Sequence, residues 1–131
     1  MKPILLVAEE DAELRQIYAR YLTGRGYRVE TAADGLECLE KLRRLMPAVL
    51  VLDRQLCWGG ADGVLAWLRE QNARAGVSVV LTAMAGRPAD GLSDIQPPVV
   101  KLLPKPFALT ALLECVRAAA ADHSRREGQF T

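Results

Sequence analysis

The 131-residue sequence has few of the residues that crosslink chains or bind transition metals. It contains one histidine and three cysteines, Cys38, Cys57 and Cys115. Because the cysteines are odd in number and far apart, they form neither a disulfide framework nor the paired spacing of a zinc site. This use of cysteine is typical of a reducing compartment, so we expect a cytoplasmic protein.

The sequence also lacks a long apolar run and an excess of charge of either sign. No stretch reaches the roughly 18 apolar residues of a membrane-spanning helix. The apolar run near the N-terminus is too short for a secretory signal. A net charge of +1 gives no electrostatic reason to expect a nucleic acid or a membrane surface as a partner. The length and composition fit a single globular domain.

Apolar segments of strand length alternate with helical patterns along the chain. Three of these segments are almost continuously apolar, as in strands buried on both faces of a parallel sheet: residues 4–8, 48–52 and 77–83. Two weaker strand candidates cover residues 27–32 and 99–103. Apolar residues at helical spacing lie between the strands and after the last one. The order predicts an α/β fold, a doubly wound parallel sheet of five strands.

Two segments depart from this regular alternation. The connection before the last strand contains Gly86, Pro88, Gly91, Pro97 and Pro98, which do not suit a regular helix. We therefore expect the fourth helix to be short or missing. The final residues, DHSRREGQFT, are polar, and we expect one folded domain over residues 1–121 followed by a frayed polar tail over residues 122–131.

Polar side chains stand at the ends of the predicted strands. Glu9 and Glu10 follow the first strand, Asp53 ends the third, Thr82 lies near the end of the fourth, and Lys105 follows the fifth. The carboxyl ends of parallel strands form the usual ligand-binding edge. Converging carboxylates repel one another unless a cation compensates them, and their hard oxygens suit Mg²⁺. An aspartate in such a site can accept a phosphoryl group whose charge a hydroxyl and an ammonium stabilise.

In this order and spacing the chain resembles the receiver domain of two-component response regulators, in the form of a single domain similar to the chemotaxis regulator. The resemblance rests on the acidic pair in LLVAEEDAELR, on VLVLD, on VVLTA and on KPF, and it covers roughly residues 3–121. It implies the flavodoxin-like strand order 2-1-3-4-5. It also implies that a histidine kinase or histidine phosphotransfer protein phosphorylates Asp53 with Mg²⁺, and that a downstream protein receives the signal.

The resemblance assigns further roles to individual residues. It implies that Thr82 and Lys105 contact the phosphoryl group and that the peptide bond before Pro106 is cis. The metal ligands that it implies are the side chains of Glu9, Glu10 and Asp53 and the backbone carbonyl of Gln55. We expect the chain to catalyse only its own phosphorylation and dephosphorylation and not to be an enzyme. A phosphohydrolase needs a second acid close after its nucleophile, whereas Arg54 and Gln55 follow Asp53 here.

Several features depart from the family pattern and keep an alternative open. The acidic pair usually contains an Asp, whereas both members are Glu here, unless the pair is Glu10 and Asp11. The loop after Asp53 is two residues longer than usual, with an insertion around Trp58-Gly59-Gly60 preceded by Cys57. Leu102 replaces the usual aromatic residue of the last strand. The alternative function is a pseudo-receiver, an interaction module that works without phosphorylation.

Overall fold

The apolar segments of the sequence form a parallel sheet of five strands. The computed structural model describes residues 3–58, 60–71, 76–84 and 96–128. The strands are β1 (Ile4–Ala8), β2 (Arg28–Ala32), β3 (Val49–Asp53), β4 (Ser78–Met84) and β5 (Val99–Lys105). Their order in the sheet is β2-β1-β3-β4-β5, which confirms the predicted flavodoxin-like order.

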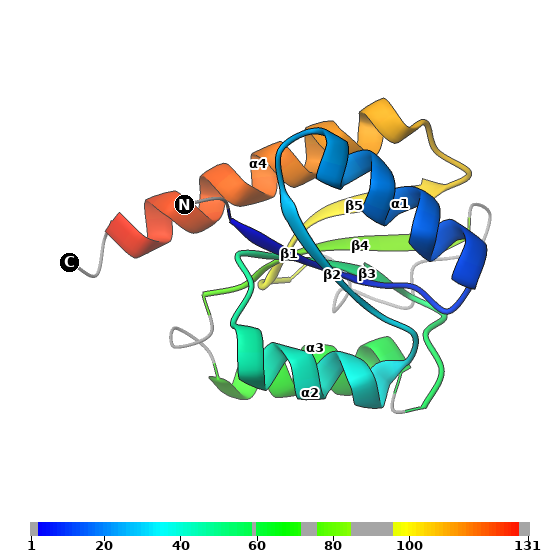
Figure 1. Cartoon of the computed structure of the whole chain (residues 1–131). Helices are drawn as coiled ribbons and strands as arrows, with labels where there is room; N and C mark the ends of the chain where they lie inside the picture. Colours follow the sequence, from blue (N-terminus) through cyan, green and yellow to red (C-terminus); the bar gives the residue numbers. More distant parts are fainter. Residues whose placement is uncertain (1–2, 59, 72–75, 85–95, 129–131) are drawn as a thin grey trace.

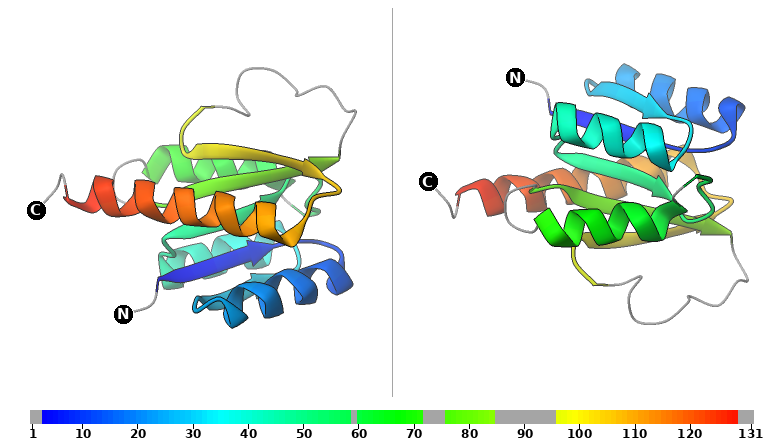
Figure 2. Two further views of the ribbon diagram at one scale, coloured as in Figure 1. Left: turned by 90° about the horizontal axis from the view of Figure 1, so that it is seen from above. Right: turned by 90° about the horizontal axis from the view of Figure 1, so that it is seen from below.

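Helices cover both faces of this sheet (Figure 1). They are α1 (Ala12–Gly24), α2 (Gly35–Leu45), α3 (Gly60–Gln71) and α4 (Leu109–Gly128). The views in Figure 2 show α1 and α4 on one face and α2 and α3 on the other. Two apolar cores result. Leu50 and Leu52 lie in the core under α2 and α3, while Val49 and Val51 lie in the core under α1 and α4. Burial on both faces explains why β3 is continuously apolar.

Local capping residues fix where the helices begin and end. The Asp11 carboxylate accepts hydrogen bonds from the backbone N–H groups of Glu13 and Leu14, and it begins α1. Asp34 caps α2 in the same manner by accepting from the N–H of Glu37. This helix ends at Leu45 and is capped by Met46, whose φ of 47° is left-handed, immediately before Pro47. The polar residues next to β1 and β2 therefore start the following helices.

The last helix is longer than the sequence predicted. It continues to Gly128, so residues 122–128 extend α4 and do not form the frayed tail that we expected after residue 121. Polar contacts hold this extension against the sheet. The Ser78 hydroxyl donates to Asp122 Oδ2 at 3.1 Å, and a ring nitrogen of His123 lies within hydrogen-bond distance of the Gly76 carbonyl. The polar composition of this segment gave no sign of its contacts with Ser78 and Gly76.

Three other expectations have mixed outcomes. The predicted short or missing fourth helix falls on residues 85–95, outside the residues that the structure describes. Not every apolar residue at helical spacing enters the core, since Leu36 on α2 is 63% exposed. In the described part of the chain, no helix is both long enough and apolar enough to span a membrane.

Candidate functional site

The parallel register brings the candidate residues to one edge of the sheet. Asp53 at the end of β3 is the direct neighbour of Thr82 on β4. On the other side of β3, Ala8 is the neighbour of Leu52, so Glu9 follows β1 at the level of Asp53. Lys105 ends β5 as the neighbour of Met84. Four strand ends therefore deliver one side chain each to the same edge.

Lys105 is the ion-pair partner of two buried carboxylates. Its Nζ lies 2.6 Å from Glu9 Oε1 and 3.6 Å from Asp53 Oδ1. Glu9, Asp53 and Thr82 are only 2%, 3% and 1% exposed. One ammonium thus faces two carboxylates in a place that water hardly reaches. Burial, followed by the nearby Asp53, raises the pKa of Glu9 despite the hydrogen bond from Lys105.

Backbone groups hold both carboxylates in position. The N–H of Asp11 donates to Glu9 Oε2 at 3.0 Å, and the N–H of Gln55 donates to Asp53 Oδ1 at 3.1 Å. The N–H of Arg54 donates to the carbonyl of Thr82 at 2.7 Å, which joins the end of β3 to β4. The nucleophile candidate is therefore preorganised by the loop that follows it.

Glu10 takes a different direction from Glu9. It is exposed, and its Oε1 accepts a hydrogen bond from Cys57 Sγ at 2.8 Å. This hydrogen bond is the main reason why the pKa of the Cys57 thiol is raised. The carboxylate of Asp11 caps α1, which favours Glu9 and Glu10 over Glu10 and Asp11 as the acidic pair. The two consecutive glutamates therefore have separate partners.

The predicted metal ligands are only partly assembled. Among the described residues, no three His, Cys, Asp or Glu side chains are grouped closely enough to hold a metal ion. Lys105 pairs with both Glu9 and Asp53, while the carboxylate of Glu10 accepts a hydrogen bond from Cys57. The donor chemistry still fits Mg²⁺, because the candidate ligands are carboxylate and carbonyl oxygens with more negative than positive charge among them.

Sequence reasoning missed two residues that support the site. Arg15, one turn into α1, donates from Nη1 to the carbonyl of Glu9 at 2.8 Å and to that of Glu10 at 3.3 Å. Tyr18 stacks on Phe107 with ring centroids 5.3 Å apart. Burial, followed by the charges of Glu9 and Asp53, raises the pKa of Tyr18 to about 12. The helical spacing of Tyr18 gives no sign of its place beside the site, and a long-range partner for Arg15 has no signal in the sequence.

Three further features can be compared with the expectations: the KPF segment, Leu102 and the insertion after Asp53. The peptide bond between Lys105 and Pro106 is cis, which confirms that prediction. Leu102, at the position where an aromatic residue was expected, is exposed on β5. The insertion after Asp53 places Trp58 on the surface with its side chain largely in solvent. Gly59, within the insertion, lies outside the described residues.

Comparison with known proteins gives a consistent result over most of the chain. Residues 5–117 match the family model of the response regulator receiver domain. The response regulator MprA of Mycobacterium leprae is 30% identical over 114 residues, which cover 87% of this chain and 49% of that protein. MprA of Mycobacterium sp. (strain KMS) is 28% identical over 124 residues, which cover 95% of this chain and 53% of that protein. The chain therefore spans about half the length of these curated relatives.

Solved structures share the fold at lower identity. A signal receiver domain from Vibrio parahaemolyticus superposes with a TM-score of 0.87 at 20% identity, over 97% of this chain and 96% of that one. A CheY-like receiver domain protein from Methanospirillum hungatei gives a TM-score of 0.84 at 18% identity, over 95% and 98% of the two chains. With the matching strand order and the family model, these similarities show that the chain belongs to the response regulator receiver domains of two-component signalling.

Proposed function

We propose that this receiver domain accepts a phosphoryl group on Asp53 from a histidine kinase or a histidine phosphotransfer protein. The observation that carries the proposal is the position of Lys105 Nζ, within 3.6 Å of Asp53 and 2.6 Å of Glu9. A buried carboxylate beside an ammonium and the hydroxyl-bearing Thr82 has the groups that phosphoryl transfer requires.

The chemistry follows from these groups. An oxygen of the Asp53 carboxylate attacks phosphorus, and the bond from phosphorus to the donor histidine nitrogen breaks. The bonding electrons stay with that nitrogen. Lys105 and the hydroxyl of Thr82 stabilise negative charge on the phosphoryl oxygens, while the N–H of Gln55 keeps Asp53 oriented. The domain carries out only its own phosphorylation and dephosphorylation and turns over no separate substrate.

The proposed reaction depends on Mg²⁺. The candidate ligands are Glu9, Glu10, Asp53 and the backbone carbonyl of Gln55, all of which offer the hard oxygens that Mg²⁺ prefers. When bound, the ion neutralises charge on the carboxylates and on the phosphoryl oxygens. The Cys57 thiol competes for the Glu10 carboxylate, because it donates a hydrogen bond to one of its two oxygens.

The contact between Glu10 and Cys57 also supports a second candidate function. A receiver whose acidic pair does not converge on its acceptor could act as a pseudo-receiver, a partner-binding module independent of phosphorylation. The contacts of Lys105 with Glu9 and Asp53 favour the phosphoacceptor, since a site without that chemistry has no need of this buried arrangement. The three cysteines are free thiols, which supports a cytoplasmic location for either function.

Incubation with acetyl phosphate and Mg²⁺ tests the proposal. Intact-mass spectrometry should show the addition of one phosphoryl group to the wild-type chain and none to Asp53→Ala. Asp62→Asn is a matched control, because Asp62 is an exposed carboxylate in the same segment that pairs with Arg54. Uptake by Asp53→Ala, or a folded wild type that gains no mass with any phosphodonor and divalent metal, would refute phosphorylation of Asp53; the second result would favour the pseudo-receiver.

A further inference from the structure

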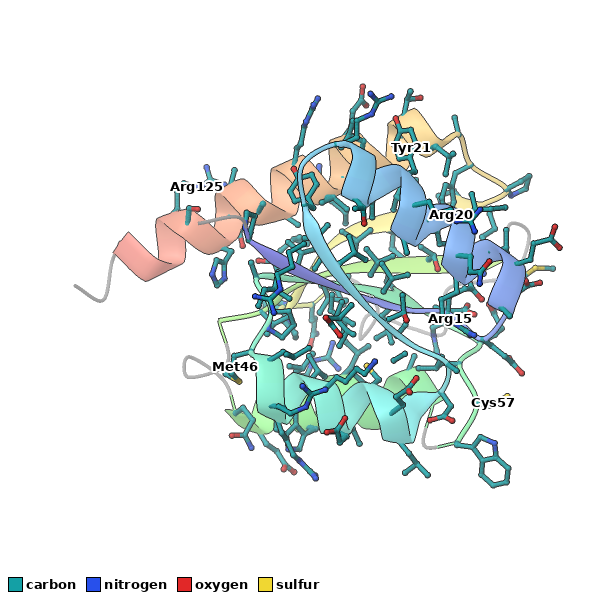
Figure 3. All side chains as sticks on the ribbon, in the orientation of Figure 1. Arg15, Arg20, Tyr21, Met46, Cys57 and Arg125 are labelled. Atoms are coloured by element: carbon teal, nitrogen blue, oxygen red, sulfur yellow. The ribbon has the colours of Figure 1, made fainter. Side chains whose placement is uncertain are left out.

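Two large apolar side chains lie exposed at the sheet edge that carries Asp53. Leu36, in the first turn of α2, is 63% exposed, and Trp58, in the loop between β3 and α3, is 72% exposed. Single exposed apolar residues are common, but a tryptophan this exposed is unusual. Figure 3 labels Cys57, the residue before Trp58, beyond the strand ends and beside the start of α2.

The loop that carries Trp58 lies against the start of α2, the helix that carries Leu36. The N–H of Gly35 donates to the carbonyl of Cys57 at 2.8 Å, so the loop is docked on the start of α2. A Cβ atom at Gly35 would lie 2.3 Å from the carbonyl oxygen of Trp58, so only glycine allows this close approach. Trp58 has a φ of 54°, which is left-handed and unfavourable for a bulky residue. The fold therefore maintains the exposure of Trp58 at the expense of local strain.

Carboxylates surround this apolar pair. Asp34 and Glu37 flank Leu36 on α2, and Glu10 lies beside the loop through its hydrogen bond with Cys57. In the part of the chain that the structure describes, none of these three carboxylates forms an ion pair with Lys or Arg. Asp34 and Glu37 accept backbone hydrogen bonds at the N-terminus of α2, and their charges together with that of Glu10 make this rim acidic, which repels nucleic acids and anionic lipids and attracts a basic partner.

We propose that Trp58 and Leu36 anchor a docking surface for a protein partner that presents a short basic segment with apolar side chains. Exposed aromatic anchors with a charged rim are the arrangement by which proteins combine affinity with steering. This Trp58–Leu36 surface consists of those two anchors and the carboxylates of Glu10, Asp34 and Glu37. The inference specifies the partner in the proposed signalling function, but binding requires no phosphoryl group.

Defined peptides test the proposal on the unphosphorylated chain. The probes are an amphipathic Lys/Leu peptide and a Glu/Leu peptide of the same length and pattern. In a Trp67→Phe background Trp58 is the only tryptophan, since the sequence has two. The Lys/Leu peptide should shift Trp58 emission to the blue and bind at least about tenfold more tightly than the Glu/Leu peptide. That preference should weaken as salt is added.

Variants connect the binding to the named anchors. By calorimetry, Trp58→Ala should weaken binding of the Lys/Leu peptide by about tenfold, and Leu36→Ala should also weaken it. Ile17→Ala is the matched control, because Ile17 is an exposed apolar residue on α1, across the sheet, and affinity should stay within about twofold. Circular dichroism of each variant establishes that it is folded.

Several results would overturn the docking surface. These are no binding of the Lys/Leu peptide, equal binding of the Glu/Leu peptide, or an unchanged affinity in Trp58→Ala. Binding to vesicles that contain phosphatidylserine, or a self-association that Trp58→Ala removes, would assign the surface to a membrane or to a second copy instead. Phosphoryl uptake is measured separately by mass. If uptake fails while Trp58→Ala abolishes peptide binding, the proposed phosphorylation is wrong and the docking surface stands.

Discussion

The edge of the sheet that carries Asp53 has an inner part and an outer part that differ in how they are built. The inner part consists of the buried Glu9 and Asp53 with the half-buried Lys105, and it is assembled by strands in parallel register. The outer part, with Glu10 and Trp58, is exposed and is assembled by a loop docked on a helix start. Strands in register fix the positions of the chemical groups that they carry, whereas a surface loop exposes side chains that a partner can bind.

Glu9 and Glu10 show this difference most directly. They are adjacent in the sequence, yet Glu9 is buried against Lys105 and Glu10 lies in solvent against a thiol. Successive side chains at the end of a strand point to opposite sides, so a consecutive pair divides between the two parts. The same residue type therefore has two environments, and substitutions can separate them.

The largest expected effect comes from breaking the outer part at Gly35. In Gly35→Ala the new Cβ would lie 2.3 Å from the Trp58 carbonyl oxygen, so the loop must move. We expect a loss of about 2 kcal/mol in the free energy of unfolding, as for other overpacked positions, and a changed Trp58 emission spectrum. Urea denaturation followed by circular dichroism measures the first effect.

Gly63→Ala provides the matched control for Gly35→Ala. Gly63 also lies in the first turns of a helix, but no heavy atom stands within 4 Å of its hypothetical Cβ. The free energy of unfolding of Gly63→Ala should therefore equal that of the wild type or exceed it by up to about 1 kcal/mol, because alanine favours the helix more than glycine does. Equal stability of Gly35→Ala and wild type would mean that the loop is not held on α2 as described.

A smaller effect is expected in the inner part from Glu9→Gln. Burial and Asp53 raise the pKa of Glu9 above its ordinary value of 4.5, so the ionised form opposes folding. The favourable contribution of Glu9 is present below this value and is lost as the pH rises through the folded-state pKa. Glutamine removes this pH-dependent loss. We expect Glu9→Gln to be about 1 kcal/mol more stable than wild type at neutral pH, with the two converging below pH 4.5.

Glu10→Gln is the comparison that makes this prediction specific. Because Glu10 is exposed, its substitution should change the free energy of unfolding by less than about 0.5 kcal/mol over the same pH range. Denaturation curves recorded at several pH values between about 4 and about 8 measure the free energy of unfolding of both variants. An equal response of the two variants would contradict the division into buried and exposed parts.

The smallest effect is expected where the two parts touch, at Cys57. In Cys57→Ala, Glu10 loses its hydrogen-bond donor and becomes free to turn toward Asp53, so apparent Mg²⁺ affinity should rise by about threefold, the equivalent of one modest hydrogen bond. Cys57→Ser keeps a donor at this position and should resemble the wild type. Calorimetric Mg²⁺ titration measures the change, and identical affinities for Ala and Ser would show that the thiol does not restrain Glu10.

The sequence predicted the inner part well because its determinants are local and periodic. Continuous apolar segments identified β1, β3 and β4. The parallel register of these strands then places the polar residues near their ends side by side. Even the burial of Asp53 is consistent with its position at the end of an apolar run. The strand order was implied only by the family resemblance, and the structure confirms it.

The outer part could not be predicted because contacts between distant residues determine it. Cys57 and Glu10 are 47 positions apart, and nothing in either segment indicates that a thiol meets that carboxylate. The role of Gly35 depends on a loop that lies more than twenty positions away in the chain, since its hydrogen bond goes to Cys57. The α4 extension was missed for the same reason, because its polar residues find partners near β4.

The length of α4 distinguishes two ways in which a charge on Asp53 can affect distant parts of the domain: through its electric field and through a displacement of the helix. The helix begins beside the KPF segment, and Asp122 lies 13 residues further on, about 20 Å along the helix axis. At physiological ionic strength, electrostatic influence decays over about 8 Å. A phosphoryl group on Asp53 would lie at the edge of the sheet that also carries the Trp58–Leu36 surface, whereas the far end of α4 lies beyond the range of its charge. The far end of α4 could respond only through a rigid displacement of the helix.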